Sequence, residues 1–142
     1  CGISGPALYK HFDGKEAILA TMLVDISQRL LEEGRRRDSL NALVDWHVDF
    51  ALTYPALIVV QDRDWSALPD QAREQVRSLQ LAYIEEWVKA LQQQRPQMSA
   101  EEAQARLHAT FGLINSTPRS ARIDPTAMRG LLTQMALAAL LA

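Results

Sequence analysis

Apolar residues recur every three or four positions along most of the chain, and alternation with a period of two is almost absent. Such spacing places apolar side chains on one face of an α-helix. The longest stripe predicts a helix over about residues 13–36 and consists of Ile18, Leu19, Met22, Leu23, Ile26, Leu30 and Leu31. Further helices are predicted over about 39–54, 55–65, 70–94, 99–116 and 124–142. The expected fold class is therefore all-α.

Residues that start and stop helices set these boundaries. Pro55 favours the first turn of a short helix, because a proline there has no N–H to leave unpaired. Ser99 with Glu102 has the spacing of a capping box. Asp124 is placed to cap the last helix, and the preceding residues 117–120, Thr-Pro-Arg-Ser, are expected to form a loop.

The first sixteen residues contain two helix starts. Ser4 is a favourable N-cap with Pro6 in the first turn, and Asp13 with Glu16 begins the next helix. The first helix, about residues 4–12, is therefore short and must be held by its neighbours. Its buried face is expected to hold Leu8 and Phe12. The side chains left free to meet a phosphate backbone and a groove are Ala7, Tyr9, Lys10 and His11.

This segment resembles the recognition helix and the following helix of the tetracycline-repressor (TetR) family of bacterial transcription regulators. The matching residues are Gly2-Ile3-Ser4, Leu8-Tyr9, His11-Phe12, Lys15-Glu16 and Leu19. The resemblance implies that the recognition helix enters the major groove and that Lys15 holds a phosphate at the next helix N-terminus, a position that favours anions. The DNA-contacting residues implied in this way are Ser4, Gly5, Pro6, Ala7, Tyr9, Lys10, His11 and Lys15.

Two departures from the family pattern affect the expected domain organisation. Cys1 stands where the family usually has a small alanine. The two helices that precede the recognition helix in the family would lie before Cys1. Residues 1–37 are therefore expected to be the C-terminal part of a truncated helix-turn-helix DNA-binding domain, with a connecting helix over about 13–36. Residues 38–142 are expected to form a helical ligand-binding and dimerisation domain.

Aromatic residues follow the middle helices in rows. Trp46, Phe50 and Tyr54 are spaced by four, as are Tyr83 and Trp87. Such rows can line a cavity for an apolar ligand or can fill a core, and the sequence leaves both open. The resemblance favours an inducer pocket, with His47 and Asn115 as polar anchors or as hydrogen-bonded core residues. The expected ligand-binding residues are Trp46, His47, Phe50, Tyr54, Trp65, Tyr83, Trp87, Phe111 and Asn115.

The last two predicted helices carry surfaces suited to pairing. One has a ridge of small residues at spacings of four, three and four, and the other has a broad apolar face. A homodimer that joins two helices from each chain would bury both surfaces, whereas packing within one chain is the alternative. The expected interface residues are Ala105, Ala109, Gly112, Ser116, Met128, Leu131, Leu132, Met135 and Ala139.

Composition narrows the function classes. With 15 basic and 17 acidic residues the net charge is −2, so the chain is not generally basic like a protein coated with nucleic acid. The single cysteine excludes an internal disulfide, and no Cys/His cluster has metal-site spacing, so no metal or cofactor is expected. No signal peptide is recognised, and no apolar run approaches the roughly 20 residues that span a bilayer. A cytoplasmic location is expected.

The expected function is a ligand-responsive, DNA-binding transcriptional regulator, with repression favoured over activation. Its expected partners are operator DNA, a second copy of the chain, and a small hydrophobic or aromatic effector. One alternative is a helical-bundle enzyme, but the chain has no EXXH-type pair, nucleophile elbow or Gly-rich phosphate loop, so no enzymatic activity is expected. A second alternative is a protein-interaction module that does not bind DNA.

Overall fold

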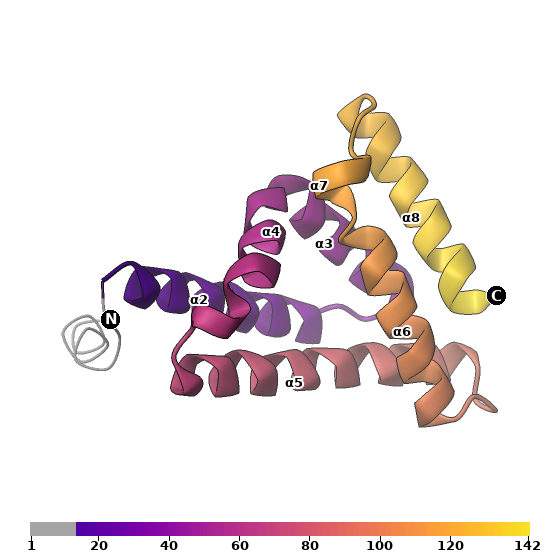
Figure 1. Cartoon of the computed structure of the whole chain (residues 1–142). Helices are drawn as coiled ribbons and strands as arrows, with labels where there is room; N and C mark the ends of the chain where they lie inside the picture. The colour runs from indigo at the N-terminus through magenta and orange to yellow at the C-terminus, as the bar shows by residue number, and fades with distance from the viewer. Residues whose placement is uncertain (1–13) are drawn as a thin grey trace.

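The computed structural model describes residues 14–142 (Figure 1). The predicted recognition helix lies outside the described residues. Of the expected DNA contacts, Lys15 is described, and the others, Ser4, Gly5, Pro6, Ala7, Tyr9, Lys10 and His11, are not. From Gly14 onward the regular elements are all helices, with no strand, which confirms the predicted all-α fold class.

The described helices follow the predicted order closely. Their bounds are α2 (Gly14–Arg35), α3 (Leu40–Thr53), α4 (Pro55–Asp64), the 3-10 turn η1 (Trp65–Ala67), α5 (Asp70–Gln94), α6 (Ala100–Ile114), α7 (Thr117–Ser120) and α8 (Pro125–Leu141). α2 and α5 lie side by side, α4 crosses near them, and α6 and α8 pair at the end of the molecule away from the start of α2 (Figure 1).

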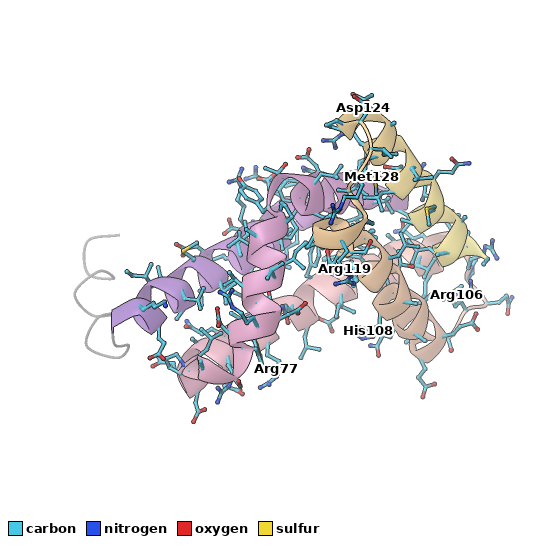
Figure 2. All side chains as sticks on the ribbon, turned by 45° about the horizontal axis from the view of Figure 1, so that its top comes forward. Arg77, Arg106, His108, Arg119, Asp124 and Met128 are labelled. Carbon is cyan, nitrogen blue, oxygen red and sulfur yellow. The ribbon has the colours of Figure 1, made fainter. Side chains whose placement is uncertain are left out.

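Side-chain caps fix three of the helix starts. The hydroxyl of Ser39 accepts a hydrogen bond from the backbone N–H of Ala42 at 3.1 Å. Ser99 caps α6 in the same way. At α8, Asp124 accepts two backbone N–H groups, and Figure 2 shows this residue at the start of the helix. Each cap satisfies donors that the first turn leaves unpaired.

The prediction of a loop over residues 117–120 is wrong. These residues form the short helix α7, with Pro118 in its first turn. The hydroxyl of Thr117 is buried and donates a hydrogen bond of 2.6 Å to the backbone oxygen of Ala51 at the end of α3. This contact bridges residues far apart in the sequence, so local turn signals could not indicate it.

The buried face of α2 differs from the predicted stripe. Leu23 and Leu31 are buried, but Ile18 and Met22 are 54% and 46% exposed. The other buried positions of the helix are small: Ala17, Ala20, Ser27 and Gly34. Because α2 lies against α5, small side chains at this contact allow the two backbones to come close.

Two apolar clusters stabilise the arrangement. The smaller one joins the first half of α2 to the start of α5, with Leu23, Leu68 and Val76 at its centre. The larger one joins α3, α5, α6 and α8 around Trp87, which is fully buried. Between Gly14 and the C-terminus no single helix is long and apolar enough to span a membrane, although the bent pair of α3 with Pro55–Ala67 passes that test by length and composition.

Candidate functional site

A cavity of about 240 Å³ lies among five helices. Its walls are mainly apolar, with a few amide, hydroxyl, imidazole and carboxylate groups between them. The lining residues are Leu23, Ile26, Ser27 and Leu30 of α2, His47 and Phe50 of α3, Leu57, Ile58, Gln61 and Asp62 of α4, Leu79, Gln80, Tyr83 and Ile84 of α5, His108 and Phe111 of α6, and Asn115. An apolar cavity with few polar groups is typical of a small-molecule site.

His47 lines this cavity and makes hydrogen bonds through both of its ring nitrogens. Its Nδ1 atom lies 2.9 Å from the Tyr83 hydroxyl, and its Nε2 atom lies 3.0 Å from Oδ1 of Asn115. Because Oδ1 of an amide can only accept, Nε2 carries the proton and donates to Asn115. In the neutral ring Nδ1 is then an acceptor, so the Tyr83 hydroxyl donates to it. The three side chains form one hydrogen-bonded row across α3, α5 and the end of α6.

Burial keeps this row uncharged. It lowers the pKa of the His47 imidazole to about 4, while the hydrogen bond to Asn115 acts in the opposite direction. Burial also raises the pKa of the Tyr83 phenol above its usual range. At neutral pH both groups are therefore neutral, and His47 acts in the cavity as a polar but uncharged ring.

Aromatic rings surround His47. The centroid of the Phe111 ring lies 4.9 Å away, and the centroids of Phe50 and Tyr83 lie 5.7 Å away. Trp87 lies behind this group, with its ring centroid 5.0 Å from that of Phe111 in an edge-on arrangement. At these distances the rings pack against one another and form one aromatic side of the cavity.

Five of the nine expected ligand-binding residues line the cavity: His47, Phe50, Tyr83, Phe111 and Asn115. The other four, Trp46, Tyr54, Trp65 and Trp87, are not part of its lining. Trp87 is fully buried in the core, and Tyr54 is 38% exposed at the end of α3. Trp46 packs at the junction of α2 with α3, and Trp65 packs in the smaller cluster. The structure therefore contains both of the arrangements that the sequence left open, a cavity and a filled core.

Much of the cavity wall was missed by sequence reasoning. α4 contributes four lining residues, yet no residue of this helix is buried, and its apolar residues 56–60 are consecutive, so their spacing does not reveal an inner face. α2 also contributes four. Ser27 offered a signal, because a polar residue among the buried positions of a helix is a candidate to line a site.

Three contacts join the C-terminal part of α2, and the residues just after it, to α3 and α5. A Cβ added at Gly34 would lie 2.8 Å from Cε1 of Tyr83, so the glycine lets the tyrosine ring rest against the helix backbone. The indole N–H of Trp46 donates to the backbone oxygen of Leu30 at 3.3 Å. The guanidinium of Arg37 lies over the Trp46 ring, 4.9 Å from its centroid. The end of α2 is therefore packed directly against α3 and α5.

The expected dimer-interface residues fall into three groups by their exposure to solvent. Met128 and Leu132 are buried in the chain's own core, so they stabilise the same chain. The small residues Ala105, Ala109 and Gly112 of α6 are exposed, and Leu131 and Met135 of α8 are 42% and 44% exposed. Ser116 and Ala139 are half-buried. The outer sides of α6 and α8 thus leave an apolar surface in contact with solvent.

A family model for the tetracyclin repressor-like C-terminal domain matches residues 25–119. The matched range contains every cavity residue except Leu23. A comparison with curated proteins gives no match. The chain belongs to the TetR family, a family of ligand-binding regulators.

Proposed function

We propose that this chain is part of a DNA-binding transcriptional repressor that a small hydrophobic molecule releases from a palindromic operator. In this proposal residues 1–37 belong to the DNA-binding domain and residues 38–142 form the ligand-binding and dimerisation domain. The effector occupies the cavity beside His47. Two copies of the chain bind the two halves of the operator.

One observation carries the proposal: the cavity shares a wall with α2. Leu23, Ile26 and Ser27 lie in the middle of that helix, and its N-terminal end directly follows the segment that resembles a recognition helix. A molecule in the cavity therefore contacts the element that continues into the DNA-reading segment. If two positions of α2 differ in how well they fit the ligand, binding shifts the population toward the better fit.

The exposed residue Lys15 in the first turn of α2 supports the DNA-binding part of the proposal. A lysine at a helix N-terminus adds its charge to the positive end of the helix dipole, so both attract a phosphate. The apolar outer surface of α6 and α8 supports the dimer part. Exposed apolar surface such as that of Leu131 and Met135 is typical of a protein interface.

The proposal is tested by filling the cavity. Ile84 lines it, and Leu81, three residues earlier on α5, is 59% exposed. We expect Ile84→Trp to keep operator binding but to abolish release by an effector found in a thermal-shift screen. Leu81→Trp, the matched control, should respond to the effector as the unmodified regulator does. An effector that releases both variants equally would contradict the proposed site, and a regulator that selects no DNA sequence would contradict the function.

A further inference from the structure

The cavity offers little to an anionic ligand. Among the residues that the structure describes, its lining includes no lysine or arginine and one carboxylate, Asp62, which would repel a second negative charge. His47 does not supply a positive charge at neutral pH, because burial lowers its pKa to about 4. The other imidazole of the lining, His108, is exposed to water, so an ion pair with it would be of the solvent-screened kind. Arg37, two residues after α2, is paired with Glu33 at 3.3 Å. A carboxylate or phosphate in the interior of this cavity would therefore lose its hydration without gaining a buried cation.

A cationic ligand also gains little in the interior. Asp62 lies on α4 and is exposed to water, so an amine beside it would form an ion pair of the solvent-screened kind. The groups deeper in the wall are aromatic rings, aliphatic chains and the neutral row of Tyr83, His47 and Asn115. The best electrostatic match is an uncharged molecule.

The direction of the hydrogen bonds in this row specifies the polar group of the ligand. Tyr83 donates to His47, and His47 donates to Oδ1 of Asn115. This bond uses one lone pair of the Asn115 oxygen, whereas the NH2 group of the same amide offers two donor protons. A ligand that meets this NH2 group must bring an acceptor, such as a carbonyl oxygen.

The size and shape of the cavity limit the rest of the molecule. About 240 Å³ is below the roughly 300–1,000 Å³ of sites for drug-sized ligands, so the ligand is small. The rings of His47, Phe50, Tyr83 and Phe111 give the wall flat faces and edges that suit an aromatic ring.

We infer that the cavity binds an uncharged aromatic molecule of one or two rings that carries a carbonyl-type hydrogen-bond acceptor directed to Asn115. This inference rests on the proposed function, because it assumes that the cavity is the effector site.

Four probes of nearly equal size test the inference: acetophenone, ethylbenzene, benzoate and benzylamine. Affinity is measured by calorimetry and by ligand-observed NMR on the intact regulator. We expect acetophenone to bind about three to ten times more tightly than ethylbenzene, since one hydrogen bond is worth about that factor. Benzoate should bind at least about tenfold more weakly than acetophenone, and benzylamine should not exceed it. Equal affinity for all four, or a preference for either charged probe, would overturn the inference.

Two variants locate the acceptor contact. Asn115→Asp keeps an acceptor for His47 but removes the NH2 donor, so the preference for acetophenone over ethylbenzene should disappear and benzylamine should gain affinity. Asn115→Leu should also abolish that preference while ethylbenzene still binds. The control is Asp49→Asn, which breaks an exposed ion pair with Arg129 and should change no probe's affinity. A preference for acetophenone that persists in both Asn115 variants would refute the assignment.

The outcomes separate this inference from the proposed function. Tight binding of benzoate with release of operator DNA would refute the inferred ligand class but would still support the proposed regulatory function. Binding of acetophenone through Asn115 without any effect on DNA would support the ligand class and contradict the regulatory mechanism. If none of the four probes binds, the inference is wrong.

Discussion

Gly34 and Tyr83 are in direct contact, and a Cβ on Gly34 would lie only 2.8 Å from Cε1 of the tyrosine ring. The hydroxyl of the same ring donates to His47 in the cavity. Tyr83 therefore contacts both the backbone of α2 and the polar centre of the proposed ligand site. A ligand that moves His47 or Tyr83 also pushes on α2, which is the physical basis of the proposed coupling.

This contact predicts that Gly34→Ala destabilises the protein by about 1–3 kcal/mol, because the added methyl group must displace the ring or the helix. Chemical denaturation measures the change. The matched control is Gly130→Ala in α8, where a Cβ would meet nothing within 4 Å. There the better helix propensity of alanine should raise the free energy of unfolding by about 0.5–1 kcal/mol. Equal stability of the two variants would show that Tyr83 does not rest on α2.

A second prediction concerns pH. The pKa of His47 is about 4 in the folded protein and 6.5 ordinarily, so the unfolded chain binds more protons between these values. The contribution of His47 to stability is therefore complete above about pH 6.5 and is lost as the pH falls toward 4, by up to about 3 kcal/mol. His47→Gln can keep both hydrogen bonds without titrating, so its stability should fall less steeply over this range. Urea denaturation at several pH values compares the two proteins.

Every other titratable group is present in both proteins, so the comparison isolates the effect of His47. An NMR titration of the His47 ring adds a direct readout. If His47 titrates near pH 6.5, or if the stability of the two proteins changes with pH in parallel, the conclusion that His47 is uncharged in the folded protein at neutral pH is wrong.

A third prediction concerns assembly. Gly112 is exposed, and a Cβ built on it would meet nothing within 4 Å among the described residues. Gly112→Leu should therefore keep the folded chain stable but weaken the proposed dimer, since the new side chain projects into the partner helix. Sedimentation velocity measures the dissociation constant. Gly130→Leu, which lies outside the row of Leu131 and Met135, is the control and should leave the dimer unchanged. A wild-type chain that stays monomeric at tens of micromolar, roughly where a standard interface holds, would rule out this interface.

A fourth prediction concerns DNA. Lys15→Ala should weaken binding to all DNA sequences and lower the salt-dependence slope by about 1, because a phosphate contact carries no sequence information. Lys89→Ala on α5 serves as the control, since Lys89 is exposed and paired with Glu86. Fluorescence anisotropy over a range of salt concentrations measures both slopes. Identical slopes for the two variants would remove Lys15 from the DNA contact.

The sequence predicted the helix order well because local chemistry sets helix ends. Ser99 and Asp124 cap the helices that they were expected to cap. The failures lie where distant segments meet. Thr117 was expected in a loop, but it begins the short helix α7 and bonds to Ala51 of α3. Ile18 and Met22 were expected on the buried face of α2, but they are exposed because α2 packs its small residues against α5.

The cavity was predictable in part for the same reason. Phe50 and Phe111 lie on helix faces that the spacing of apolar residues predicts to be buried, so these two residues could be found from the sequence. The same spacing could not tell the cavity wall from the filled core, and Trp87 belongs to the core. Gln61 and Asp62 were missed because α4 covers the cavity without burying any residue completely.

In the proposed mechanism, a ligand in the cavity and DNA bound to the segment before α2 each weaken the binding of the other. The most direct test measures the affinity of a cavity-saturating ligand for the intact regulator, free and bound to its selected operator, by calorimetry. Linkage requires that the operator weaken ligand binding by the same factor by which the ligand weakens operator binding, about 5- to 150-fold for typical coupling. A ligand that saturates the cavity with the same dissociation constant in both states would contradict the account.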